Sequence, residues 1–494
     1  MTIFTASKVA WDGETHLAVR IKGTDAILTL FDPQSPPAGR THLKGEETAV
    51  TLGGHEFGIK LSPATYENLL AFDRKVSPQR RLVALGREKG VRHGLGTGNR
   101  VVITEKDVGS LGHPEALGVF EGIFRAVKGS GVPDWFIQQS IVRELIPEGV
   151  SPEDHPGLGH TGGYGPRELL RSGLFAFLAL GGYAAPDFFI GADADHAIVT
   201  GANEEELQAS LELNRIAIAE SKDYTKFTVD TSRLFGFPVS LSPEDEKRLK
   251  AAFLGRTWEI PNILPGHPGF SYTFEEGEIL ALGRKYWRAC QVHKELYEFI
   301  AGLKGDEPFD YELSLDETAS PTEPKELLFY LVLLYEVMGL PEGAVSSAAP
   351  NLGFRKRSDY EGDVEGDLKP RTNACASILA HFGAALCIHS GSGAGIETGK
   401  GPGVDQALAE ATGGHIMLKV SGIYQEILWR TLAASPRLED RELFERAWDE
   451  THRVTRFLDL VYRRLVAGRE AAEAMRLLED EAELARIGDE WGNR

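Results

Sequence analysis

The chain of 494 residues is poor in cysteine, in positive charge and in long apolar runs. Its three cysteines, Cys290, Cys375 and Cys387, are too few and too widely spaced for a disulfide framework or a cysteine-based zinc site. Acidic residues outnumber basic residues by 73 to 53, which gives a formal net charge of −20. This balance disfavours general binding to nucleic acids or to anionic membranes, because both carry negative charge.

The apolar segments are short as well. The two most apolar ones cover residues 174–185, which end at Pro186-Asp187, and residues 327–335, which run directly into Glu336. Neither reaches the roughly 20 residues that a membrane-spanning helix needs. The first residues lack a basic segment followed by an apolar run, so we expect no signal peptide and a cytoplasmic protein.

The composition nevertheless supports a large folded core. Hydrophobic residues make up 42% of the chain and aromatic residues 9%, which excludes wholesale disorder. At about 150 residues per domain, the length allows three domains or one enlarged barrel. Many of the 55 glycines follow short apolar runs, as in the tight turns that lead from a strand to a helix.

From about residue 90 the sequence alternates between short apolar runs, Gly-rich or polar turns, and amphipathic stretches such as 204–219 and 324–338. Alternating strands and helices predict a parallel α/β sheet, and eight such units predict a (β/α)₈ TIM barrel. The eight predicted strands cover residues 91–95, 135–139, 188–192, 227–229, 311–315, 344–347, 386–389 and 416–420.

Three additions account for the remaining length. Residues 1–85 carry short strands between turns and predict a small β-rich N-terminal unit ahead of a barrel at 86–430. About 80 residues separate the fourth and fifth strands, and 274–303 is typical of one long helix, so we expect a helical insertion at about 231–309. Residues 431–494 predict a helical C-terminal extension with a solvated acidic face.

Polar side chains cluster at the predicted strand ends, where the active sites of barrels lie. Carboxylates and histidines together suit a divalent cation. A single Asp after a strand is usually only a helix N-cap, so the concentration of these residues at one face carries the prediction. The residues are Asp193, Asp195, His196, Asp230, Glu312, Asp316, Glu317, His389 and Lys419.

Other motifs do not support a nucleotide enzyme or a zinc protease. GSGAG at 391–395 lacks the glycine spacing and the following acidic residue of a dinucleotide fingerprint. TGKG at 398–401 lacks the first glycine and the Ser or Thr of a phosphate-binding loop, and no His-Glu-x-x-His occurs.

Five separated motifs resemble those of the tagaturonate epimerase family of metal-dependent sugar epimerases. The segments FSYTF at 270–274 and RKYWRA at 284–289 add to the resemblance, which covers residues 90 to 430 in family order. The five motifs are QQSIVRE (138–144), GADADH (191–196), ELSLDETASPT (312–322), HSGS (389–392) and LKVSG (418–422).

The resemblance implies an isomerase whose barrel holds one divalent cation (Mn, Zn, Co or Ni) and acts on an open-chain ketouronate or ketohexose. Asp195 and Glu317 would form an acid/base pair, and His196, His389 and Asp359 would bind the metal. The residues implied to contact the substrate are Ser140, Arg143 and Lys419, with Arg143 and Lys419 as candidates to meet a carboxylate.

The chain departs from the family pattern beside the expected site. Gly393 stands where Asp follows HSGS in the family, Asn351 stands where Arg is expected, and 155–165 is typical of an insertion. As a substrate contact, Asn351 would favour a neutral ketose, so tagatose/fructose and tagaturonate/fructuronate both remain candidates. A sugar isomerase, an aldolase or a non-catalytic sugar-binding protein on the same barrel are the alternatives, and a homo-oligomer is compatible with the sequence.

Interconversion of tagaturonate and fructuronate inverts a hydroxyl-bearing carbon whose proton is not acidic, so simple enolisation does not reach it. Two other routes could invert this carbon: retro-aldol cleavage followed by re-addition, or transient oxidation by a nicotinamide. Since no nicotinamide fingerprint is present, the aldol route is favoured, with a metal polarising the ketone and carboxylates moving the hydroxyl proton.

Overall fold

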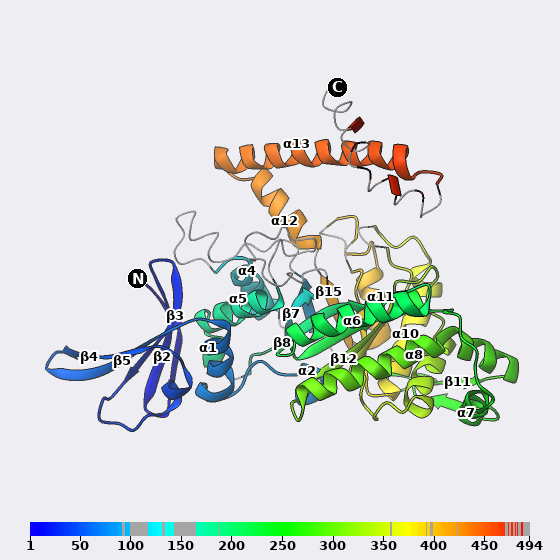
Figure 1. Ribbon diagram of the computed structural model, residues 1–494, viewed down its shortest axis with the longest axis horizontal. Coiled ribbons are helices and arrows are strands. Elements are labelled where there is room, and N and C mark those ends of the chain that lie inside the picture. The colour runs from blue at the N-terminus through cyan, green and yellow to red at the C-terminus, as the bar shows by residue number, and fades with distance from the viewer. Residues whose placement is uncertain are drawn as a thin grey trace. The chain divides into compact units, whose positions relative to one another are not determined.

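The structure is a computed structural model that describes residues 1–90, 94–98, 117–130, 134–142, 165–185, 187–355, 358–391, 393–395, 399–420 and 422–469, with isolated positions between 473 and 487. The chain divides into two compact units, Met1–Ile423 and Tyr424–Arg494. The first unit contains an N-terminal sheet and a ring of parallel strands (Figure 1).

The N-terminal sheet is antiparallel, with the strand order β1-β2-β3-β5-β4. Its hairpins have two-residue turns with positive φ at both positions, as at Asp12 (+50°) and Gly13 (+78°). Such turns match the twist of paired strands and favour Asn, Asp or Gly. The strands are β1 (Thr2–Trp11), β2 (Glu14–Ile21), β3 (Thr24–Phe31), β4 (Glu46–Leu52) and β5 (His55–Pro63).

Eight parallel strands form a closed ring in the order β12-β13-β14-β15-β6-β7-β8-β9. This confirms the prediction of a mixed α/β fold built on a parallel sheet. The strands are β6 (Gly94–Gly98), β7 (Asp134–Ser140), β8 (Phe189–Ile198), β9 (Lys226–Asp230), β12 (Asp310–Leu315), β13 (Ser347–Pro350), β14 (Ala385–Ile388) and β15 (Ile416–Val420).

Two predicted strands are displaced by three residues. The strand predicted at 91–95 is β6 at Gly94–Gly98, and the one predicted at 344–347 is β13 at Ser347–Pro350. In the second case the backbone donors at 344 and 345 bind the turn carbonyl of Pro341 and the hydroxyl of Tyr335. These N–H groups therefore cannot hydrogen-bond a neighbouring strand, and the pairing of β13 with β12 begins at Ser347.

Helices follow the strands of the ring along the chain. At the start of α6, the Asn203 side chain caps the helix by accepting a hydrogen bond from the N–H of Glu206. The helices are α4 (Val119–Ser130), α5 (Pro166–Ala179), α6 (Glu204–Glu220), α9 (Pro324–Val332), α10 (Lys369–His381), α11 (Val404–Thr412) and α12 (Gly422–Ala433).

The segment between β9 and β12 contains α7 (Pro243–Phe253), a hairpin of β10 (Thr257–Ile260) and β11 (Phe270–Thr273), and α8 (Glu276–Lys304). The long helix lies where the sequence predicts it, and the insertion also contains a hairpin that the sequence analysis does not anticipate. Burial alternates along β10, which is the period of a strand with one covered face.

The second unit is helical in its described part. It contains α13 (Leu438–Val461), and Val461, Leu465 and Ile487 form a small core. In the described part of the chain, no helix combines the length and apolar character that a bilayer crossing requires. All three cysteines are buried and none forms a disulfide.

A short segment before the ring packs against the N-terminal ends of its strands. Val83 and Leu85 are buried with Ala385 and Met417, and α2 (Leu85–Lys89) follows. Asp310, the first residue of β12, accepts the N–H of Gly86 at 2.8 Å and that of Arg87 at 2.9 Å. This carboxyl therefore fixes α2 to the ring.

Burial raises the pKa of Asp310 from 3.8 to about 6. The folded protein thus binds a proton there more tightly than the unfolded chain, so this contribution to stability is complete below about pH 4 and is lost as the pH rises through 6. We expect the free energy of unfolding of the wild type, minus that of Asp310→Asn, to fall by about 2 kcal/mol between pH 4 and pH 7. Urea unfolding across this range measures it, and a constant difference would contradict the assignment.

Candidate active site

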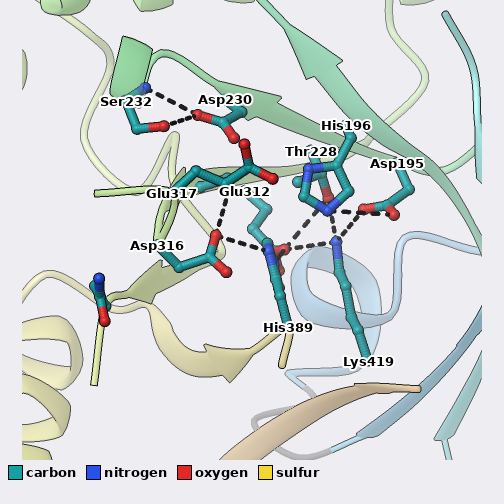
Figure 2. A network of polar contacts seen from close by, with 12 residues as sticks. Asp195, His196, Thr228, Asp230, Ser232, Glu312, Asp316, Glu317, His389 and Lys419 are labelled. Carbon is teal, nitrogen blue, oxygen red and sulfur yellow. Dashed lines mark hydrogen bonds and ion pairs between the residues drawn. The ribbon is translucent and has the colours of Figure 1, made fainter. Parts of the chain in front are cut away.

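A bulge in β8 brings two neighbouring side chains to the same end of the ring. The pairing of β8 with β9 shifts between Ala194 and Ala197, and His196 has a left-handed φ of +55°. In a regular strand Asp195 and His196 would point to opposite faces. The bulge redirects them, so that Asp195 meets Lys419 and His196 meets His389 (Figure 2).

Glu312 of β12 is the centre of a buried polar network inside the ring. Its Oε1 lies 2.8 Å from His389 Nε2 and 2.7 Å from Lys419 Nζ. Its Oε2 lies 2.6 Å from Lys226 Nζ and accepts the hydroxyl of Ser347 at 2.5 Å. Residues in β9, β13 and β15 and directly after β14 therefore all contact this one carboxylate.

Lys419 of β15 connects this carboxylate to β8. Its Nζ lies 2.7 Å from Asp195 Oδ1 and 2.9 Å from Asp193 Oδ2, and it donates to the Thr228 hydroxyl at 2.6 Å. The residue is 4% exposed. This predicted substrate contact is thus embedded in the network rather than presented to a ligand.

The network sets the charge of its members. Burial alone would raise the pKa of Glu312, but Lys226 and Lys419 hold it well below its usual range. Burial opposes the charge of Lys419, yet Asp193, Asp195 and Glu312 raise its pKa well above the ordinary value. Both groups are therefore ionised at neutral pH.

His196 and His389 lie together where β8 and β14 end. Their ring centroids are 5.0 Å apart at 76°. His389 Nδ1 lies 3.2 Å from Asp316 Oδ1, and the Ser314 hydroxyl donates to the same Asp316 oxygen at 2.9 Å. His196 Nε2 lies 3.6 Å from Asp195 Oδ2. The pair is thus held from two sides by carboxylates.

Asp230 ends β9 beside this pair. Its Oδ1 accepts the N–H of Ser232 at 2.8 Å and the hydroxyl at 2.6 Å (Figure 2). Burial raises the pKa of Asp230, against the opposing charge of His196. Its Oδ2 and the Nδ1 of His196 are buried atoms without a hydrogen-bond partner among the described residues.

Glu317, the second predicted member of the acid/base pair, is more accessible than Asp195. Its side chain is 24% exposed, and its Oε2 lies 3.4 Å from Arg233 Nη2. It follows Asp316 in the loop between β12 and α9. These two adjacent carboxylates contact different residues, because Asp316 lies against His389 and Glu317 against Arg233.

Two cavities flank this loop and share Thr318, Ala319 and Pro321 as walls. One, of about 310 Å³, is lined by Glu317 and Ser232 together with residues of α8. The other, of about 430 Å³, is lined by Asp316, Asn351 and Asp359.

Asp359 and Asn351 serve local loop structure in this arrangement. Asp359 Oδ1 accepts the N–H of Ala394 at 3.0 Å. A Cβ at Gly393 would lie only 1.6 Å from the carbonyl oxygen of Gly399, which excludes any side chain there in this loop conformation. The Asn351 amide donates to the carbonyl of Thr318 at 2.9 Å and accepts the N–H of Gly353 at 2.7 Å.

The two remaining predicted contacts are only partly described. Ser140 ends β7 in register with Asp195, which places its backbone beside the site, while its side chain lies outside the described residues. Arg143 lies outside the described residues altogether. Of the predicted residues, the structure therefore brings together Asp195, His196, His389 and Lys419.

Lys226 and Thr228 have no role predicted from the sequence, and Asp193, Asp230, Glu312 and Asp316 have none beyond a strand-end position. A signal was present, because polar residues alternate at 226, 228 and 230 and again at 312, 314 and 316. That period of two, in strands buried along their whole length, identifies side chains that point into the ring.

Lys419→Met tests how strongly the buried network depends on its ammonium group. The substitution leaves Asp193, Asp195 and Glu312 with one lysine among them, so we expect a loss of about 3–5 kcal/mol in the free energy of unfolding. Lys325→Met is the control, because Lys325 is 35% exposed and pairs with Glu278 at 2.7 Å. That variant should lose less than about 1 kcal/mol in the same urea titration, and equal losses would contradict the model of a buried network.

Comparison with known proteins places the chain in a family. Residues 100–423, about two thirds of the chain, match the sequence profile of UxaE, tagaturonate epimerase. A curated tagaturonate/fructuronate epimerase of Thermotoga maritima is 27% identical over 281 residues, which are 56% of this chain. The match spans 47% of that relative, about half of its length.

The fold is similar to that of solved structures. The native crystal structure of fructuronate-tagaturonate epimerase from Cohnella laeviribosi aligns with 98% of this chain and 84% of its own, with a TM-score of 0.59 and 18% identity. A form complexed with one glycerol aligns with a TM-score of 0.58, also at 18% identity. Because the family profile covers well over half of the sequence, this chain belongs to the tagaturonate epimerase family.

Proposed function

We propose that this chain is a divalent-metal-dependent epimerase that interconverts tagaturonate and fructuronate on a (β/α)₈ barrel. The observation that carries the proposal is the meeting of His196, His389 and buried carboxylates at the ends of parallel strands, where barrel enzymes hold their reacting groups. The relative from Thermotoga maritima is named for this interconversion, and the closed ring of strands supports the barrel class.

The donor atoms of the site suit a cation. His196 Nδ1 and Asp230 Oδ2 are buried without hydrogen-bond partners among the described residues, and the two imidazole rings are close enough to share one ion. Imidazole with carboxylate is a ligand set for Mn, Zn, Co or Ni. Five buried carboxyl groups also face only two ammonium groups, so the site holds more oxygen donors than the two lysines alone can pair with. They are Asp193, Asp195, Asp230, Glu312 and Asp316, against Lys226 and Lys419.

We propose His196 and His389 as metal ligands, with Asp230 in place of Asp359 as the carboxylate ligand. The contacts of Asp359 hold the 393–401 loop, whereas Asp230 presents an unpartnered oxygen near His196. Glu312, Cys387 and His389 also have ligand atoms within 4.8 Å of one another. A cation at that triad would have to displace Lys226 and Lys419 from Glu312, which makes it the weaker candidate.

The reaction follows from what the chain's own groups can do. A bound divalent cation supplies Lewis-acid polarisation of the substrate ketone. Glu317, which is accessible, takes the proton from the hydroxyl of the carbon to be inverted, and the bond from this carbon to the carbon next to the ketone breaks. The hydroxyl-bearing carbon becomes an aldehyde, and the electron pair of the broken bond remains on the other fragment as an enediolate.

Inversion then needs the aldehyde to turn and the carbon–carbon bond to re-form on its other face. The new alkoxide regains a proton, so atoms and charge balance over the cycle. We propose Asp195 as the second carboxylate of the acid/base pair, oriented by Lys419 at 2.7 Å. Lys226, Lys419 and Glu312 act beneath the reacting atoms by fixing the positions of Asp195 and His389.

Metal removal tests the function directly. We expect chelator-treated protein to lose interconversion of tagaturonate and fructuronate and to regain it with Mn²⁺, Zn²⁺, Co²⁺ or Ni²⁺, measured by NMR of the sugar products. The pair tagatose and fructose is assayed in parallel. Release of three-carbon fragments would instead indicate an aldolase, formation of an aldose an isomerase, and no metal-dependent turnover of any pair would refute the proposal.

Glu317→Gln tests proton transfer. Loss of a positioned acid/base group lowers rates by about 10²–10⁴-fold, so we expect kcat to fall in this range while bound metal, measured by mass spectrometry, is unchanged. Asp195→Asn should also lower kcat. The control is Glu336→Gln, since Glu336 pairs with Arg256 on the surface and should be removable without effect. Wild-type kcat in Glu317→Gln would remove this residue from the mechanism.

A further inference from the structure

A substrate with a carboxylate requires a cation that can reach it, and the described part of the ring interior does not offer one. Lys226 and Lys419 are 2% and 4% exposed and are surrounded by carboxylates. Asn351, at the position of a family Arg, is neutral, and its amide is bound to the 318–322 loop. Among the described residues, a cationic side chain that can reach the substrate therefore comes from outside the ring of strands.

The cavity of about 310 Å³ beside Glu317 supplies such a charge. It lies between α8 and the loop between β12 and α9, and Lys285 of α8 is the basic residue in its wall. The Lys285 side chain is 42% exposed, and its Nζ lies 2.7 Å from Glu326 Oε2. An ammonium group has three donors, so this single bond leaves donors for a ligand.

The other walls fit an open-chain sugar. Phe235, Tyr286 and Tyr330 form an aromatic wall, with ring centroids 4.9 Å apart for the first pair and 5.2 Å apart for Tyr286 and Tyr330. Ser232, Thr318 and Ser320 are polar residues in the remaining wall. Aromatic faces with a few polar groups are typical of small-ligand pockets, and the volume lies at the lower end of their range.

This cavity also lies next to the proposed reacting groups. Glu317 lies in its wall, and Ser232, another wall residue, holds Asp230 through its N–H and hydroxyl. The cavity of about 430 Å³ on the other side of the loop is less suited to an anion, because four carboxylates line it against two arginines. Both arginines, Arg355 and Arg371, pair with carboxylates of the same wall, Glu361 and Asp367.

The position of Lys285 is fixed by its surroundings. Its carbonyl accepts the N–H of Gly236 at 2.8 Å, which connects α8 to the segment after β9. Neighbouring Tyr286 is buried and donates its hydroxyl to Glu326, the partner of Lys285. The insertion between β9 and β12 thus places one ammonium group at the edge of the active site.

We propose that this cavity binds the carboxylate end of the open-chain ketouronate, and that Lys285 is the residue that selects a uronate over a neutral ketose. The inference rests on the proposed epimerase function, which supplies the reacting end of the same substrate. It assigns to the insertion a role in specificity rather than in chemistry.

Lys285→Gln tests this assignment. A hydrogen bond to a charged group contributes about 1.5–3 kcal/mol, which corresponds to a factor of roughly 10–100. We expect the KM for tagaturonate to rise by this factor, kcat to change by less than about threefold, and the affinity for tagatose, as substrate or competitor, to stay at the wild-type value. Lys285→Arg, which keeps the charge, should restore most of the tagaturonate affinity.

Lys325→Gln is the matched control, because Lys325 has similar exposure and an equivalent pair with Glu278 but does not line the cavity. It should leave both affinities unchanged. An unchanged KM for tagaturonate in Lys285→Gln, or an equal loss of affinity for tagatose, would overturn the proposal.

Calorimetric titration separates this inference from the proposed reaction. If the metal-loaded wild type binds tagaturonate but does not turn it over, the epimerase function fails while the Lys285 variants still report on the cavity. If turnover occurs and Lys285→Gln does not discriminate between the sugars, only the cavity assignment fails. Wild-type protein that binds neither sugar overturns both.

Discussion

A single buried carboxylate, Glu312, organises the inside of the ring of strands. It has no exposed surface, so its charge is tolerated only because Lys226, Lys419, His389 and Ser347 bind its two oxygens. These partners come from β9, β15, β14 and β13, and the carboxylate therefore also fixes the register of the strands that carry them. Loss of either lysine leaves buried negative charge without one of its two ammonium partners.

Above this carboxylate the balance of charge changes. Around Glu312 each charge has a close counter-charge, whereas His196 and Asp230 each keep a buried atom without a hydrogen-bond partner among the described residues. The bulge in β8 produces this difference, because it brings Asp195 to the lysine and His196 to the other histidine. A lower layer of paired charges thus lies beneath an upper layer that keeps polar atoms without a partner among the described residues.

The insertion between β9 and β12 contributes residues to the proposed site from outside the ring of strands. His293 of α8 hydrogen-bonds Tyr311 at 2.9 Å and Thr231 at 3.0 Å, which attaches the helix to β12 and to the end of β9. The same helix carries Lys285 and Tyr286 to the cavity beside Glu317. In the function we propose, chemistry and recognition are therefore placed on different elements, with the strands and the loop after β12 carrying the reacting groups and the inserted helix supplying an accessible cation.

The sequence by itself determined the parallel strands, the long helix near 274–303 and the polar strand ends that include Asp195, His196, Glu317 and His389, because these follow from local period and composition. It missed the β10–β11 hairpin and the three-residue displacement of β13. Tertiary structure alone decided that Asp359 and Asn351 support loops, that Lys419 is enclosed and that Asp230 faces His196. Lys419 and Asp195 are 224 residues apart, and such contacts depend on how the ring closes, which no local pattern encodes.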